Sequence, residues 1–123
     1  MKRIIFTLAF LVSLFSLQAE NINHIATAFK SGNALLLEGC LADKIEITYG
    51  GAKKQYSKTE ATTLFKSFFE RNKAKSYSII HQAEKKERGF YIALFGAEAK
   101  EYRINITYLA QGGSILIQTI RIE

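Results

Sequence analysis

The chain has little of what small stapled or metal-bound domains depend on. It contains a single cysteine, Cys40, so it cannot close an internal disulfide or build a cysteine-rich zinc module. With only two histidines and one aspartate, it offers no group of residues at metal-ligand spacing. No apolar run reaches the roughly 20 residues of a membrane-spanning helix. We therefore expect neither a metal nor another cofactor.

Cys40 lies in an apolar stretch, residues 34–42. We interpret it as a small buried side chain. An intermolecular disulfide and a reactive nucleophile are the alternatives.

What is present describes one small folded domain. The chain has 123 residues, of which 48% are hydrophobic and 12% aromatic, and this composition excludes a disordered protein. The length is too short for a two-domain enzyme. We expect a single domain over residues 20–123.

Residues 1–19 have the pattern of a secretory signal peptide. Lys2 and Arg3 precede an uncharged apolar stretch, residues 4–17, and Gln18-Ala19 leads into polar sequence. We predict an exported protein, periplasmic or extracellular, that meets a membrane only through this peptide before cleavage. Leu17 lies two residues before the last residue of the predicted signal peptide, where a smaller residue is usual for cleavage. An uncleaved N-terminal anchor is therefore the alternative.

Basic residues exceed acidic ones, 17 to 11, which gives a net charge of +6. The excess falls to +4 without Lys2 and Arg3. The remaining basic residues gather at predicted turns and are not interleaved with stacking aromatics, as nucleic-acid recognition would need. We expect no nucleic-acid partner.

Three helices are predicted near the start of the domain. The first carries Ile22, Ile25, Ala26 and Phe29 on one face, begins after a possible cap at Asn21, and ends at residues 31–33 with a glycine. A second helix over residues 34–41 is apolar nearly throughout, so we expect it inside the core.

The third helix has the strongest local signal. Ser57 and Glu60 are spaced as a capping box. Apolar residues at helical spacing then extend to about Asn72 and include three phenylalanines, which predicts the main helix of the core. These apolar residues are Ala61, Leu64, Phe65, Phe68 and Phe69.

Six extended segments complete the pattern. The last four are joined by short turns, which make neighbouring strands antiparallel hairpins. Helices first and a meander afterwards predict an α+β fold, with the helices on one face of a curved antiparallel sheet. The predicted strands cover residues 44–49, 53–56, 76–84, 90–97, 101–109 and 115–122.

The second face of this sheet needs a cover. The strand 90–97 is apolar on both sides, and we expect Tyr91 and Phe95 on the face away from the helices. A homodimer built sheet to sheet through this outer face would cover them. The alternative is that they are covered locally by a strand end.

Several short segments resemble a known family. In their order and spacing, the chain from residue 21 to 123 resembles exported bacterial proteins catalogued as domain of unknown function 4783. Those proteins are similar to the nuclear-transport-factor-2-like, cystatin-like-cone superfamily. Residues 83–86 depart from the small turn expected there. The matching segments are Ser31-Gly32-Asn33, Tyr56-Ser57-Lys58, Phe68-Phe69, Ile80-His81-Gln82, Tyr102-Arg103 and Arg121-Ile122-Glu123.

The resemblance implies a cystatin-like cone with a cavity between sheet and helices, and it implies no activity. A proton-transfer enzyme with this fold would need a carboxylate in the cone. Asp43 lies at a strand edge and Glu46 faces away from the apolar side, so we predict a non-enzyme.

The candidate site is a set of polar side chains that strand alternation places near the cavity or the interface. His81 lies four residues after Tyr77 on the same predicted strand, so alternation places both side chains on one face, toward the core or cavity. His81 would be either a ligand anchor or a hydrogen-bonded structural residue. Arg103 could bind an anion through its guanidinium group, or be a charge on the outer face. The predicted ligand or interface residues are Tyr49, Tyr77, His81, Tyr91, Tyr102 and Arg103.

Three functions remain open at this point. The first is a non-catalytic exported domain that binds a small apolar or amphipathic ligand, or a protein partner. The second is a small enzyme with His81 as general base. The third is a purely structural interaction or dimerisation module. A filled cone would favour the third, and a cavity of a few hundred cubic ångströms the first.

Overall fold

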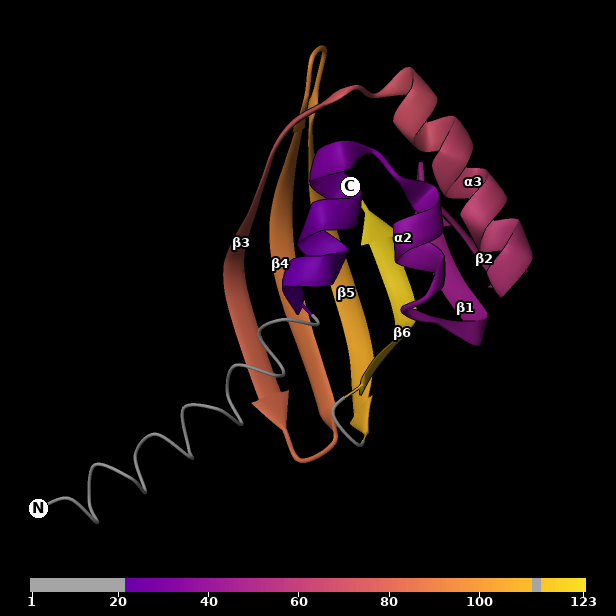
Figure 1. The fold of residues 1–123 in the computed structure, drawn as a ribbon, viewed down its shortest axis with the longest axis vertical. Helices are drawn as coiled ribbons and strands as arrows, with labels where there is room; N and C mark the ends of the chain where they lie inside the picture. The colour runs from indigo at the N-terminus through magenta and orange to yellow at the C-terminus, as the bar shows by residue number, and fades with distance from the viewer. Residues whose placement is uncertain (1–21, 112–113) are drawn as a thin grey trace, which may run out of the picture.

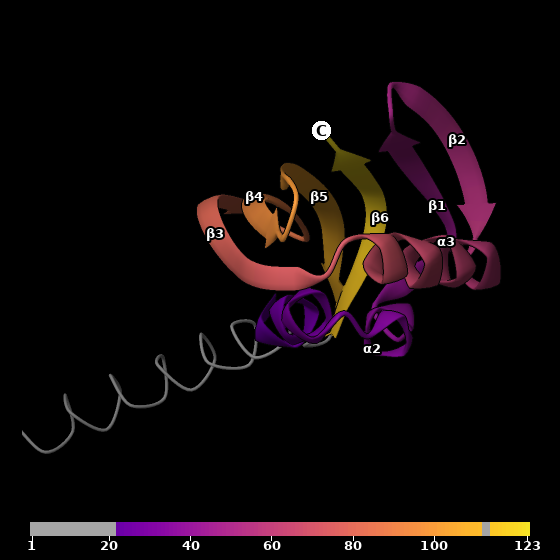
Figure 2. The same cartoon turned by 90° about the horizontal axis from the view of Figure 1, so that it is seen from above.

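The computed structural model describes residues 22–111 and 114–123 (Figure 1). The α+β prediction is confirmed, because helices pack against one face of a curved six-stranded sheet (Figure 2). The predicted signal peptide and Asn21 lie outside the described residues. After a first helical segment, residues 22–31, the elements are α2 (Ala34–Glu38), β1 (Leu41–Tyr49), β2 (Ala52–Ser57), α3 (Lys58–Arg71), β3 (Ala74–Lys85), β4 (Arg88–Ala97), β5 (Glu101–Gln111) and β6 (Ser114–Ile122).

The sheet has the strand order β2-β1-β6-β5-β4-β3. The predicted hairpins are confirmed, since β3, β4, β5 and β6 pair antiparallel in sequence order, as do β1 and β2. The prediction of a wholly antiparallel sheet is wrong, because β1 pairs parallel with β6. The segment from β2 through α3 to β5 separates these two strands in sequence, so no turn signal could report their pairing.

The caps confirm the predicted end of the first helical segment and the predicted start of α3. Gly32 has φ +65°, and the Asn33 amide donates to the Ala28 carbonyl at 2.9 Å. The Ser57 hydroxyl accepts from the Glu60 amide at 3.1 Å, and the Glu60 carboxylate accepts from the Ser57 amide at 2.9 Å. This capping box begins α3 where the sequence places it.

The second helix is shorter and less buried than predicted. α2 ends at Glu38, and residues 39–40 turn the chain into β1. Leu37 is buried, but the side chain of Leu35 is 61% exposed. A five-residue helix presents little more than one turn to the core, so residues on opposite sides of that turn cannot both be buried. The buried position predicted for Cys40 is confirmed.

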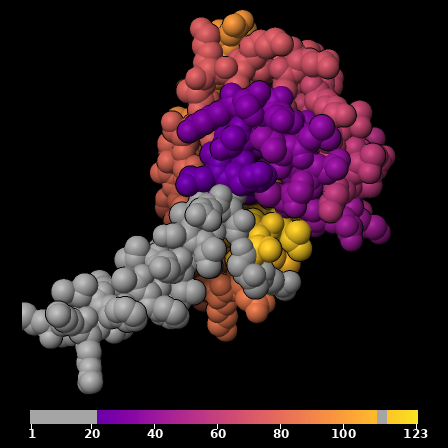
Figure 3. Space-filling model, viewed as in Figure 1, coloured from indigo at the N-terminus to yellow at the C-terminus, as the bar shows by residue number. Residues whose placement is uncertain are grey.

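The core lies between the helices and the concave face of the sheet. Phe29, from the first helical segment, packs edge-to-face on Phe65 of α3 and stacks on Tyr77 of β3 with ring centroids 4.8 Å apart. Phe68 packs against Phe95 of β4 at 5.7 Å. Figure 3 shows this side of the molecule covered by the two N-terminal helical segments and α3. No helix in the described part of the chain is long and apolar enough to cross a membrane.

Tyr91 and Phe95 lie on this inner face and are fully buried. The prediction that they face away from the helices is wrong. They pair across the sheet with Ile106 and Tyr102, whose side chains are also buried. Because β4 is apolar on both sides, its own pattern could not show which side meets the helices.

Candidate functional site

Two of the predicted site residues meet in the core. The Tyr77 hydroxyl donates a hydrogen bond to the Tyr91 hydroxyl at 3.1 Å, and both side chains are buried. Burial raises the pKa of both phenols well above the usual value, so both are neutral at neutral pH. Burial also raises the pKa of the nearby Cys40 thiol, which disfavours the reactive thiolate. This pair is therefore a satisfied polar contact within an apolar core.

A third tyrosine lies beside this pair. The ring centroids of Tyr108 and Tyr91 are 6.3 Å apart, and the Tyr108 hydroxyl donates to the Glu84 carboxylate at 3.2 Å. Burial raises the pKa of Tyr108. Glu84 itself is exposed, near the end of β3. The carboxylate that binds a core tyrosine thus lies at the surface, in contact with solvent.

Tyr49 and Tyr102 belong to a different part of the molecule. Both pack edge-to-face on Phe68, and the Tyr102 hydroxyl donates to the Asn72 side chain at 2.8 Å. They line a groove of about 320 Å³ together with Lys100 and Glu123. The structure therefore separates these two tyrosines from the Tyr77–Tyr91 pair, and the six predicted residues do not form one site.

His81 points away from the core, so the prediction of its direction is wrong. The β3–β4 register pairs Ile79 with Ala93 but His81 with Ile92, which leaves Ile80 as a bulge residue. A one-residue bulge moves every later side chain of the strand to the other face. His81 is exposed, and its ring lies 5.6 Å from the ring of Phe90.

Arg103 is exposed on the face of β5 opposite the buried Tyr102 and Ile104. Its backbone amide and carbonyl bond with Glu123, each at 2.9 Å. Across the same outer face, the Asn105 side chain donates to the Glu123 carboxylate at 2.8 Å, and Arg121 lies 3.3 Å from that carboxylate. The outer face of β5 and β6 is thus polar here, and several of its side chains bond with one another. Whether any of the six predicted residues binds a partner stays a prediction.

The outer face of β4 is apolar along residues 90–94, unlike the outer face of β5 and β6. Phe90 is 38% exposed, while Ile92 and Leu94 are half-buried. On the free edge strand β3, Ile80 is 51% exposed at the bulge. We call Ile80, Phe90, Ile92 and Leu94 the outer apolar patch. Alternation in the sequence 90–97 shows that both sides of β4 are apolar, but it does not show which side lies outside.

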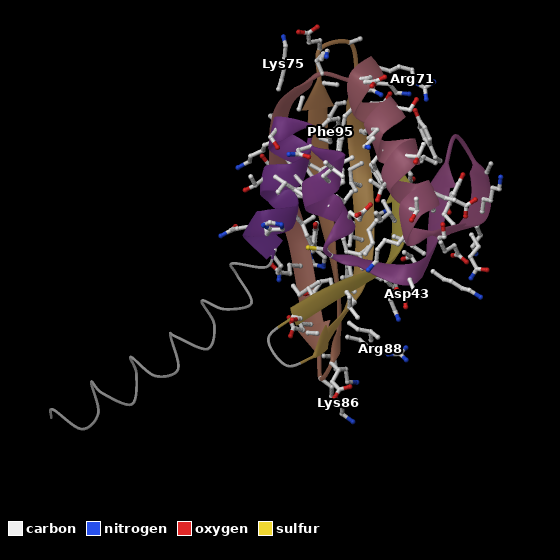
Figure 4. The ribbon with its side chains drawn as sticks, turned by 45° about the vertical axis from the view of Figure 1, so that its right-hand side comes forward. Asp43, Arg71, Lys75, Lys86, Arg88 and Phe95 are labelled. Carbon is white, nitrogen blue, oxygen red and sulfur yellow. The ribbon has the colours of Figure 1, made fainter. Side chains whose placement is uncertain are left out.

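A groove of about 440 Å³ lies at the end of the β3–β4 hairpin, next to this patch. Lys85, Arg88 and Phe90 line it. Figure 4 shows Arg88 and Lys86 at this end of the sheet, far from Phe95 in the core. The sequence had shown these bases only as solvated turn charges, because nothing in a linear pattern reveals that they share a groove with an aromatic ring.

Metal-binding clusters are missing from the part of the chain that the structure describes: no three His, Cys, Asp or Glu side chains gather there. Within the described part of the chain, buried apolar side chains, many of them aromatic, fill the interior. The grooves described above open at the surface.

Comparison with known proteins agrees with this architecture. The family model "Domain of unknown function (DUF4783)" matches residues 22–123. The chain belongs to this family. A crystal structure of a DUF4783 family protein from Bacteroides ovatus is 28% identical, with a TM-score of 0.76 over 80% of this chain and 90% of that one. The family has no assigned function, so membership in DUF4783 indicates no catalytic role.

More distant structures show the fold alone. An NTF-2 like protein of unknown function from Silicibacter pomeroyi is 13% identical, with a TM-score of 0.64 over 95% of this chain and 97% of that one. A putative ketosteroid isomerase from Shewanella frigidimarina is 15% identical, with a TM-score of 0.68 over 89% and 97%. This DUF4783 domain therefore has the NTF2-like, cystatin-like-cone fold. A search of curated proteins finds no significant match.

Proposed function

We propose that this DUF4783 domain is a non-catalytic interaction module that forms a homodimer through the outer face of its sheet. The observation that supports the proposal is the outer apolar patch, on a face that none of the described helices covers. Exposed apolar surface that is contiguous and bordered by polar residues is typical of interaction sites. The signal-peptide pattern of residues 1–19 would place this module outside the cytoplasm.

The filled core argues against a ligand carried inside the cone. Phe29, Phe65, Phe68 and Phe95 are fully buried, and their rings contact one another at the edge-to-face distances of a close-packed core. The Tyr91 hydroxyl accepts the hydrogen bond of the Tyr77 hydroxyl, so each of these buried oxygens has a partner within the core. A filled interior leaves the surface as the place where a partner can bind.

The position of the outer apolar patch on the sheet suits a second copy of the same chain. A two-fold axis between two stacked sheets, running across the strands, would place one outer apolar patch over the other, as an isologous interface requires.

Light scattering after size exclusion tests this proposal on the full domain, with two lysine substitutions. Ile92→Lys places a charge at the centre of the outer apolar patch, and Leu35→Lys places the same charge at an exposed leucine of α2 in the helical layer. We expect dimers for the wild type and Leu35→Lys and monomers for Ile92→Lys, because an uncompensated charge in an interface is costly.

A wild type that stays monomeric at high micromolar concentration would overturn the proposal. So would an Ile92→Lys variant that dimerises as the wild type does. Circular dichroism of each variant checks that the fold is kept.

A further inference from the structure

The hairpin-end groove lies beside the outer apolar patch and shares only Phe90 with it. Its volume, about 440 Å³, lies in the range of small-molecule sites. It is bounded by the last residues of the β3–β4 hairpin on one side and by β5 and β6 on the other. The residues that shape it on the outer face are Ala83, Lys85, Arg88, Phe90, Thr107 and Gln118.

Two cations stand side by side in this groove. Lys85 and Arg88 are directly opposed as the last pair of the hairpin register, on the same face as Phe90. Like charges at directly opposite positions of a sheet repel each other. Neither forms a salt bridge with any carboxylate in the described residues. An anion between them would relieve this repulsion.

The acidic residue of the groove does not fill that role. Glu84 alternates with Lys85 along β3, so its side chain leaves the strand on the inner face. There its carboxylate accepts the hydrogen bond of the buried Tyr108 hydroxyl at 3.2 Å. The salt bridges of the described residues include neither Glu84 nor Glu87, so neither acidic residue of the hairpin pairs with the two bases on the outer face.

The rest of the groove is apolar with a few polar groups. The Phe90 ring is 38% exposed, and Ala83 is its cross-strand partner on the same face. Gln118 sits at the β5–β6 register shift, and its exposed amide stands at the groove wall. An apolar floor with two adjacent cations at one end suits a molecule with an apolar body and one anionic head.

We propose that this groove binds an amphipathic carboxylate, with its apolar chain along Phe90 and Ala83 and its carboxylate between Arg88 and Lys85. The Arg88 guanidinium can bind a carboxylate through two parallel hydrogen bonds. Lys85 adds a second charge at the same point. This small-molecule site goes beyond the proposed dimer, and it depends on groove residues rather than on self-association.

The test is a titration of the ¹⁵N-labelled domain with decanoate, followed by amide chemical shifts. Decanol, which keeps the chain, and acetate, which keeps the head, are the matched probes. We expect decanoate to shift the amides of the hairpin and of residues around Gln118, and to bind at least tenfold more tightly than either matched probe.

Three variants make the titration specific. Arg88→Gln should weaken decanoate binding about tenfold or more, the loss typical of a charge-assisted hydrogen bond. Phe90→Ala should weaken it as well. Arg103→Gln removes an exposed arginine of the same outer face away from the groove, and it should bind as the wild type does. The dispersion of the amide spectrum checks that each variant is folded.

Several outcomes would overturn the proposal. These are shifts confined to other parts of the chain, equal loss in Arg88→Gln and Arg103→Gln, or decanol binding as tightly as decanoate. The Ile92→Lys variant keeps the two proposals distinguishable. If it is monomeric and binds decanoate normally, both hold; if wild type is monomeric and binds decanoate normally, only the dimer fails.

Discussion

The two faces of β4 carry similar apolar residues in different surroundings. On β4, the inner residues Tyr91, Ala93 and Phe95 are buried, while Phe90, Ile92 and Leu94 alternate with them on the outer face. Both sets are apolar, yet only the inner set is covered by helices in the described structure. The comparison shows that apolar alternation identifies a strand but does not tell its core face from its interaction face.

The largest expected difference between the faces is in packing. Phe68→Ala removes a fully buried ring that contacts Tyr49, Phe95 and Tyr102, and it should lower the unfolding free energy by about 3–5 kcal/mol. Leu116→Ala, at an outer-face leucine that is 37% exposed, should cost less than about 1 kcal/mol. Urea unfolding of both variants at one protein concentration measures the difference. Equal losses of unfolding free energy in the two variants would contradict the difference in packing between the two faces.

A smaller effect is expected from the buried hydroxyl pair. Tyr91→Phe removes the acceptor of the Tyr77 hydroxyl and leaves that hydroxyl buried without a partner, which should cost about 2 kcal/mol. The double variant Tyr77→Phe/Tyr91→Phe should cost less than the sum of the two single variants. Thermal or urea unfolding measures all three. Strict additivity would show that the two hydroxyls are not coupled.

The same variant changes the response to alkaline pH. Burial raises the folded-state pKa of Tyr91 above 10, so the folded chain keeps a phenolic proton that the unfolded chain loses. This contribution to stability is complete below pH 10 and is lost as the pH rises above it. We expect the fall in unfolding free energy between about pH 9 and about pH 11 to be shallower in Tyr91→Phe than in wild type.

The smallest expected effect concerns free space on the inner face. A Cβ added at Gly89 would lie within 3 Å of the Tyr108 ring, which must then tilt away from Glu84. Gly89→Ala should therefore destabilise the domain by about 1 kcal/mol. At Gly39, where an added Cβ meets nothing within 4 Å and φ is −62°, alanine should be neutral or slightly stabilising. A neutral Gly89→Ala in urea unfolding would show that the inner face has room to adjust.

Much of the local structure could be predicted because its causes are local. The capping box at Ser57 and Glu60 and the glycine at position 32 each act within a few residues of the chain. Short turns likewise specify hairpins between sequential strands. Predictions that depended on such signals agree with the structure, including the α+β class and the buried phenylalanines of α3.

The candidate site could be predicted much less well. The direction of His81 was inferred from unbroken alternation, and the bulge at Ile80 reversed it. Strand alternation grouped Tyr49 and Tyr102 with Tyr77, but the strands that carry them place them at separate positions. Side-chain direction in a strand depends on every register shift before it, and a register shift leaves no clear sign in a single sequence.

The sequence by itself determined the helix caps, the turns, the hairpin order and the amount of apolar surface to be buried, because each depends on neighbours along the chain. Only the tertiary structure decided the parallel pairing of β1 with β6, the burial of Tyr91 and Phe95, and the outward turn of His81. It also brought Lys85, Arg88 and Phe90 into one groove. These features depend on which surfaces exclude water together, and that is a property of the whole packed molecule.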